Sequence, residues 1–216
     1  MSKLTRSTIN ANAPIDYFYQ APKSGSPLFL LLHGFAQQWS DVYQELVKIL
    51  PQGAGVLAPN GIYPLPKRNK ETNEWEVSYA WYFFDREKRK YLIDQTFSRD
   101  ILTRLIHEEL NHQGEVIIIG FSQGGYLAPF VASTLKQVTK VIMINANLKV
   151  DLLPKTIDAQ TLCLNGAKDP IVCPKNARQS FDQWISNGNS GEFFELDKTH
   201  HSISPQILDK LIELIK

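Results

Sequence analysis

The sequence predicts an α/β fold in which helices cover both faces of a mainly parallel central sheet. Short runs of apolar, β-branched residues, such as 116–119, alternate with stretches whose apolar residues recur at helical spacing. This alternation is typical of strand–helix–strand units. The run 28–32 is apolar throughout, as in a strand buried on both faces. The length of 216 residues suits one core, so we expect residues 1–216 to form a single domain.

The apolar runs that predict strands are each bounded by glycine, proline or polar residues. They cover residues 28–32, 56–59, 116–120, 140–144, 161–164 and 192–196. Residues 6–20 alternate loosely and predict an edge hairpin, with Pro14 at a turn or edge position. Sites in parallel sheets form outside the carboxyl ends of the strands. We therefore expect functional residues in the loops 33–38, 60–94, 120–124, 145–150, 165–173 and 197–204.

Helical periodicity predicts helices at 40–50, 95–112, 123–136, 175–187 and 205–215. Ser40 is the expected N-cap of the first helix, and Pro205 the expected first-turn proline of the last. The stripe of the second helix consists of Phe97, Ile101, Leu102, Leu105, Ile106 and Leu110. Pro129 lies inside the third, where a proline disfavours helix by about 3 kcal/mol, so we expect a bend or an early end.

Residues 60–94 interrupt the alternation of strands and helices. They contain two prolines, a polar run, a charged run and an aromatic cluster at 79–84, with little periodicity. A long stretch of this kind inside a compact domain is usually functional or mobile. We therefore predict that 60–94 forms a lid or a wall of the substrate pocket.

Composition excludes several classes of protein. The net charge of +1 does not indicate a nucleic-acid or anionic-membrane partner. No apolar run approaches the length of a membrane-spanning helix, and the first residues lack the apolar region of a secretory signal. Cys163 and Cys173 are too few for a disulfide framework and lack metal-ligand spacing. A reducing, cytoplasmic setting is therefore expected.

A G-x-S-x-G motif with Ser122 at its centre lies between the strand 116–120 and the helix 123–136. This placement holds a serine on a sharp strand-to-helix turn, with its hydroxyl above the sheet. The glycines two residues before and after it leave room where a Cβ would collide with neighbouring backbone. The motif alone recurs by chance, but its position indicates a nucleophile, which requires a histidine and an acid after later strands.

The histidine that activates the serine is expected after the last strand, where either His200 or His201 fits. Asp169, which directly follows the strand 161–164, is the expected acid that orients this histidine. Asp197 shares the histidine loop, and Asp158 precedes its strand at the other end of the sheet, so both are less suitable. The chain order serine, aspartate, histidine is that of α/β-hydrolases.

Backbone N–H groups are expected to bind the oxyanion of a tetrahedral intermediate. One belongs to Gln123, directly after the nucleophile, and the other to Phe35, in the loop after the strand 28–32. His33 precedes the serine in the chain and is expected to shape the turn at Gly34. His107 and His112 are expected on the surface.

Four segments together resemble the phospholipase/carboxylesterase family, which includes the acyl-protein thioesterases. They are Leu32-His33-Gly34-Phe35, Gly120-Phe121-Ser122-Gln123-Gly124-Gly125, Asn165-Gly166-Ala167-Lys168-Asp169-Pro170-Ile171-Val172 and His201-Ser202-Ile203. The resemblance extends from about residue 20 to the end. It implies the α/β-hydrolase fold and a serine hydrolase of esters or thioesters that needs no cofactor or metal. It favours His201, which precedes Ser-Ile, over His200.

The resemblance also places Trp81 near the active site, since Ala80-Trp81-Tyr82 is similar to the family's Ala-Trp-Phe segment. The family usually has Ser-Gly where this chain has Asn145-Ala146-Asn147, and Pro129 is a second departure. These departures bear on the choice of substrate. Phe35, Trp81 and Ile171 are candidate acyl-pocket residues, each with core packing as the alternative.

The resulting hypothesis is hydrolysis of a small-molecule or acylated substrate through an acyl-enzyme. The expected catalytic residues are Ser122, Asp169 and His201. Two alternatives stay open, namely acyl transfer or another chemistry on the same triad, and a ligand-binding protein without catalysis. The sequence does not predict the acyl chain length, ester or thioester preference, or oligomeric state.

Overall fold

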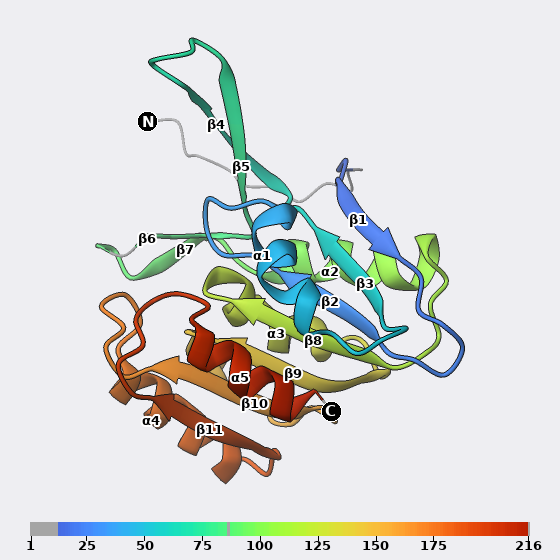
Figure 1. Ribbon diagram of the computed structural model, residues 1–216. Helices are drawn as coiled ribbons and strands as arrows, with labels where there is room; N and C mark the ends of the chain where they lie inside the picture. The colour runs from blue at the N-terminus through green and yellow to red at the C-terminus, as the bar shows by residue number, and fades with distance from the viewer. Residues whose placement is uncertain (1–12, 86, 216) are drawn as a thin grey trace, which may run out of the picture.

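The computed structural model describes residues 13–85 and 87–215, and its centre is a seven-stranded sheet (Figure 1). The strand order is β1-β3-β2-β8-β9-β10-β11. The bounds are β1 Tyr17–Gln20, β2 Leu28–Leu32, β3 Gly55–Pro59, β8 Val116–Phe121, β9 Val138–Ile144, β10 Gln160–Gly166 and β11 Gly191–Leu196. All neighbours are parallel except β1 and β3, which confirms the predicted mainly parallel sheet.

Helices cover both faces of the sheet, as predicted. In Figure 1, α1 (Trp39–Leu46) and α5 (Pro205–Leu214) lie on the near face. On the other face lie α2 (Thr96–Arg104), α3 (Gln123–Ala132) and α4 (Pro174–Ser186). Short helical turns add Val47–Ile49, Leu105–Glu109 and Val150–Leu152. Each face has its own apolar core, one packed by α1 and α5 and the other by α2, α3 and α4.

The central strands are buried on both faces because helices cover both. All five residues of β2 are fully buried, as are most of those in β8 and β9. Burial of large apolar side chains such as these stabilises a fold by about 1.5–3 kcal/mol each. This core fixes the carboxyl ends of β2, β8, β9 and β10 relative to one another. The loops that follow these ends, together with the loop after β11, form the site.

The segment 60–94 consists of two antiparallel hairpins rather than irregular structure. The first pairs β4 (Tyr63–Arg68) with β5 (Trp75–Ala80), and its tip extends away from the sheet in Figure 1. The second pairs β6 (Phe83–Asp85) with β7 (Lys90–Ile93). Much of both hairpins is solvent-exposed, so neither hairpin has a fully buried face. Their strands therefore lack the alternation of apolar residues by which strands are predicted from sequence.

Several predicted element details were wrong. The first helix has Gln38 rather than Ser40 as its N-cap, and the Asp41 carboxylate accepts from the Gln38 N–H at 2.7 Å. Phe97 is 39% exposed and does not belong to the buried stripe of α2. The helix α3 ends at Ala132 rather than at 136, consistent with the early end expected from Pro129.

The amino-terminal region is only partly described. Its described part contains β1, an edge strand that pairs with β3, so the predicted edge position is confirmed for 17–20. Residues 6–12 of the predicted hairpin lie outside the described residues. In the part of the chain that the structure covers, no helix is long and apolar enough to cross a membrane.

Candidate active site

Ser122 lies on a sharp turn between β8 and α3. Its φ of 50° and ψ of −115° are unusual for a residue with a side chain. The turn is fixed on both sides, because the Ser122 N–H donates to the Ile144 carbonyl and its own carbonyl accepts from Tyr126 N–H. A Cβ on Gly124 would lie 2.3 Å from the Leu32 carbonyl oxygen, so only glycine permits this approach of α3 to β2.

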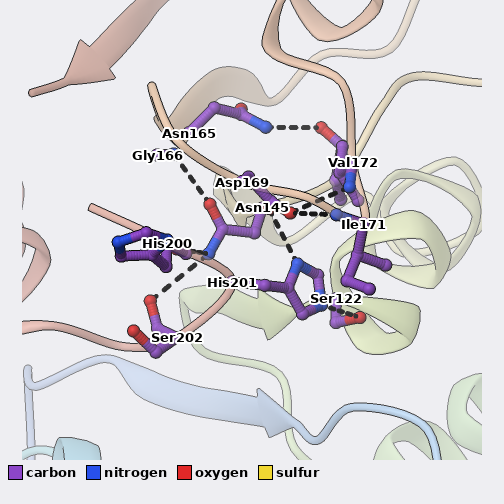
Figure 2. Close-up of polar contacts among 11 residues, drawn as sticks. Ser122, Asn145, Asn165, Gly166, Asp169, Ile171, Val172, His200, His201 and Ser202 are labelled. Carbon is purple, nitrogen blue, oxygen red and sulfur yellow. Dashed lines mark hydrogen bonds and ion pairs between the residues drawn. The ribbon is translucent and has the colours of Figure 1, made fainter. Parts of the chain in front are cut away.

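Ser122, His201 and Asp169 form a continuous hydrogen-bonded chain (Figure 2). His201 Nε2 lies 2.8 Å from Ser122 Oγ, and His201 Nδ1 lies 2.7 Å from Asp169 Oδ2. The other Asp169 oxygen accepts from the N–H groups of Ile171 and Val172 at 2.8 and 2.9 Å. These contacts hold the carboxylate still and favour the imidazole tautomer with its proton on Nδ1, which leaves Nε2 free to accept the serine proton.

The two histidines at the end of the last strand are in different surroundings. His201 has a side chain that is 18% exposed and points at Ser122 (Figure 2). The neighbouring His200 is exposed and its ring points away from the serine (Figure 2). The rival carboxylates Asp158 and Asp197 are also exposed, whereas the carboxylate of Asp169 is fully buried. The structure therefore brings together the three residues expected from the chain order and the family resemblance.

The loop after β2 carries the expected oxyanion donor, the Phe35 N–H. Gly34 N–H donates to the Gln37 side chain at 2.7 Å, and Ala36 N–H donates to the Tyr79 carbonyl at 3.0 Å. In the described part of the chain, no hydrogen bond occupies the Phe35 N–H. The other expected donor, Gln123, is the first residue of α3, so its N–H has no partner within the helix.

His33 supports this loop from below, as predicted. Its ring is fully buried, with Nδ1 2.6 Å from the Gly34 carbonyl and Nε2 accepting from Gly61 N–H at 2.8 Å. Burial lowers the pKa of His33 to about 4, against smaller opposing effects of the Gly34 hydrogen bond and of Asp41. His33 is therefore neutral at pH 7, with the proton on Nδ1.

Trp81 lies beneath the loop after β2, which carries the expected oxyanion donor and is called the oxyanion loop below. Its ring is fully buried, and its indole N–H donates to the His33 carbonyl at 2.9 Å. The Gln123 side chain accepts from Trp81 N–H and donates to the Tyr82 carbonyl, both at 2.8 Å. The other candidate pocket residues, Phe35 and Ile171, are 54% and 52% exposed. Residues 79–82 thus connect the oxyanion loop to the nucleophile turn.

Three side chains that position the site were not identified from the sequence: those of Gln37, Gln123 and Asn145. Gln123 and Asn145 bond to the backbone of loops remote in sequence, whereas Gln37 accepts from the Gly34 N–H within its own loop. Such partners leave no pattern in the sequence around them. A signal existed only for Asn145, where the chain departs from the Ser-Gly of the family it resembles.

An open groove of about 320 Å³ borders the site on the side of α1. Its walls include Gln37, Asp41, Phe121, His201 and Ile203. A larger groove of about 520 Å³ lies between β11 and α5 and contains none of the three triad residues. Among residues 13–85 and 87–215, no three His, Cys, Asp or Glu side chains gather in a group that could hold a metal ion.

Comparison with solved structures shows the α/β-hydrolase fold. The Bacillus cereus carboxylesterase matches with a TM-score of 0.74 at 15% identity, over 94% of each chain. Esterase PE8 matches with a TM-score of 0.71 at 18% identity, over 93% of this chain and 97% of that one. Zea mays acyl-protein thioesterase 2 matches with a TM-score of 0.69 at 16% identity, over 93% of this chain and 97% of that one.

Sequence comparison identifies the family. No curated protein matches the chain. The family model described as serine hydrolase (FSH1) matches residues 24–202, a span that includes the nucleophile turn, the acid loop and His201. The chain belongs to the FSH1 family of serine hydrolases.

Proposed function

We propose that this serine hydrolase cleaves carboxylic esters or thioesters through an acyl-enzyme. The observation that carries the proposal is the unbroken chain of hydrogen bonds from Ser122 through His201 to Asp169. The carboxylesterases and the acyl-protein thioesterase with the same fold favour esters and thioesters as the first substrates to test.

In the acylation step, Ser122 Oγ attacks the carbonyl carbon while His201 Nε2 takes the hydroxyl proton. The resulting oxyanion accepts hydrogen bonds from the N–H groups of Phe35 and Gln123, and each such donor contributes on the order of 3 kcal/mol to transition-state stabilisation. His201 then gives its proton to the departing alcohol or thiol, which leaves an acyl group on Ser122. Asp169 stabilises the imidazolium throughout.

In the deacylation step, a water molecule replaces the alcohol or thiol. His201 takes one proton from the water as its oxygen attacks the acyl carbon, and Ser122 leaves with that proton. The products are the free carboxylic acid and the regenerated serine. The α1-side groove borders His201, which protonates the leaving group, so we assign this groove to the leaving group and to the incoming water.

The segment 60–94 supplies the wall of the site in this proposal. Residues 79–81, where β5 ends, hold the oxyanion loop. The tip of the β4–β5 hairpin extends away from the sheet (Figure 1). Trp81 supports the pocket from beneath, and Ile171, beside Asp169, is the proposed surface contact for the acyl group. A cytoplasmic setting also belongs to the proposal, because Cys163 and Cys173 are both free thiols.

Hydrolysis of p-nitrophenyl esters in ¹⁸O-labelled water tests the function directly. We expect a burst of one p-nitrophenol per chain, followed by steady turnover with ¹⁸O in the carboxylic acid. An acyl-length series of esters and matching thioesters then gives the preferred substrate. Product carrying an acceptor other than water would instead indicate an acyltransferase, and a folded chain without any turnover would contradict the enzyme proposal.

A further inference from the structure

Asn145 connects the acid loop to the histidine loop. It follows β9 and is fully buried, with a φ of 50°. Its Oδ1 accepts from Gly166 N–H at 2.9 Å, at the start of the loop that carries Asp169. Its Nδ2 donates to the carbonyls of His200 and Ser202 at 3.1 and 3.3 Å, the two residues that flank His201 (Figure 2).

The amide uses its acceptor and both donors in these contacts. Only this orientation of the amide places an acceptor at the Gly166 N–H and donors at two carbonyls. An aspartate would turn a carboxylate toward two carbonyl oxygens, and a serine has only one donor. Both loops are thus fixed to one side chain, and the distance between Asp169 and His201 depends on it.

From these contacts we infer that Asn145 is a positioning residue for the proposed triad, a role that rests on the proposed function. It acts on the protein groups of the triad and not on the substrate. Its loss changes the alignment of His201 with Ser122 and Asp169, so it lowers kcat and leaves KM nearly unchanged. A displacement of this kind costs about 10- to 100-fold in rate.

The test compares Asn145→Gly and Asn145→Asp with the wild-type chain. Glycine suits the positive φ and removes the amide, while aspartate keeps the acceptor and removes both donors. A fluorophosphonate end-point titration counts competent serines, so kcat per titrated site is independent of the folded fraction. We expect both variants to lose about 10- to 100-fold in kcat per site at nearly constant KM. Wild-type kcat per site in Asn145→Gly would overturn the role, and absent wild-type turnover would contradict the proposed function itself.

A second, independent observation concerns Lys149, on the loop that follows β9. Its Nζ lies 5.2 Å from the Tyr126 ring centroid and 5.7 Å from that of Phe84. Burial lowers the pKa of the Lys149 amino group. Within the described residues, no Asp or Glu forms an ion pair with it. This half-buried cation thus lies against two aromatic rings and has no carboxylate partner among the described residues.

Lys149 belongs to the edge of the sheet that carries the site. Its loop leaves β9 at Ile144, whose carbonyl binds the Ser122 N–H, and Tyr126 N–H binds the Ser122 carbonyl. Side chains on a helix lean toward its amino terminus, which brings the Tyr126 ring toward the nucleophile turn. On the same loop, Asn147 Oδ1 is buried and has no hydrogen-bond donor among the described residues.

His201 and Tyr126 pack against the cores on opposite faces of the sheet. The His201 ring packs on Phe121, which belongs to the core on the α1 and α5 face. Tyr126 packs against the opposite core, formed with α2, α3 and α4. Since the leaving group must reach His201 in the proposed function, we assign the acyl group to the opposite face, on the side of Tyr126 and Lys149. We propose that Lys149 binds an anionic group, such as a carboxylate, at the far end of the acyl chain.

This proposal rests on the proposed function and is tested with two esters of equal carbon number. The esters are p-nitrophenyl hexanoate and p-nitrophenyl hydrogen adipate, each corrected for hydrolysis without enzyme. We expect the wild-type chain to favour the adipate, and Lys149→Met to lower kcat/KM for the adipate by about 10-fold or more, as for loss of a charged hydrogen bond. The hexanoate should be nearly unaffected, and Lys149→Arg should retain the preference.

The possible outcomes separate the anionic subsite from the proposed esterase function. Equal effects of Lys149→Met on both esters, or a wild-type preference for the hexanoate, would overturn the anionic subsite while leaving the esterase proposal intact. Turnover of neither ester by the wild-type chain would contradict the proposed function, and the subsite with it.

Discussion

The two halves of the site are held together in different ways. The triad half consists of Ser122, Asp169 and His201, which touch through their own side chains. The oxyanion half consists of the loop after β2, which is held by backbone groups of 60–94 and by Trp81 beneath it. Residues with a chemical role can be found from their type and order, whereas the hydrogen bonds through which Gln37, Trp81 and Gln123 support a backbone donor cannot. Substitutions in each half can therefore be tested separately.

Loss of a triad side chain should have the largest effect on rate. Ser122→Ala and His201→Ala should each lower kcat by about 10⁴-fold or more, because such residues act as a unit. Asp169→Asn should lower it by a similar factor, because the amide no longer favours the required tautomer. The matched control is His200→Ala, which removes an exposed ring one residue away. A larger loss in His200→Ala than in His201→Ala would reverse the assignment of the base.

Protonation of His33 should destabilise the oxyanion half in acid. The pKa of His33 is about 4 in the folded chain, against 6.5 for the exposed side chain, so it contributes nothing above pH 6.5. As the pH falls from 6.5 to 4, the unfolded chain gains this proton first, and the folded state loses about 3 kcal/mol of stability. Urea unfolding of the wild-type chain and His33→Gln at pH 7 and pH 4 isolates this contribution. If the unfolding free energies of the wild-type chain and His33→Gln fell equally between pH 7 and pH 4, His33 would not make this contribution.

Trp81→Phe should weaken the oxyanion half while leaving the triad in place. The variant keeps an aromatic ring but loses the N–H that binds the His33 carbonyl. We expect kcat to fall by about 10-fold with little change in KM, because the Phe35 N–H is displaced slightly from the oxyanion. Trp75→Phe, at a position that is 67% exposed, serves as the control. Equal kinetics for the two variants would show that the indole N–H does not position the loop.

The β4–β5 tip should contribute least. Trp75→Ala removes an exposed ring far from the Tyr79 end of β5, and we expect a change in unfolding free energy within about 0.5 kcal/mol. Turnover of a short ester should be unchanged. A loss confined to long-chain esters would instead indicate that the hairpin covers the acyl group as a lid. The acyl-length series used for the wild-type chain makes this distinction.

The fold could be predicted because its strands are buried on both faces. Wholly apolar runs such as Leu28–Leu32 must be buried, so they predict the strands of the sheet and the loops in which the site lies. Ser122 and Asp169 follow such strands, and His201 follows the half-buried edge strand β11. Their side chains suit one chemistry, and the structure brings the three together as expected.

The parts that could not be predicted depend on hydrogen bonds to backbone groups. The hairpins of 60–94 are largely exposed, so their sequence did not need to alternate. The Asn145 amide bonds to an N–H and carbonyls on loops far away in sequence, and the Gln37 amide bonds to the Gly34 N–H of its own loop. Their roles became visible only when the loops were placed in space.

Mass spectrometry of the intact chain after treatment with a fluorophosphonate tests whether Ser122 is an activated nucleophile. We expect one adduct per wild-type chain, located on Ser122 by peptide mapping and absent from Ser122→Ala. A folded wild-type chain that gains no adduct, or an adduct that persists in Ser122→Ala, would contradict this expectation.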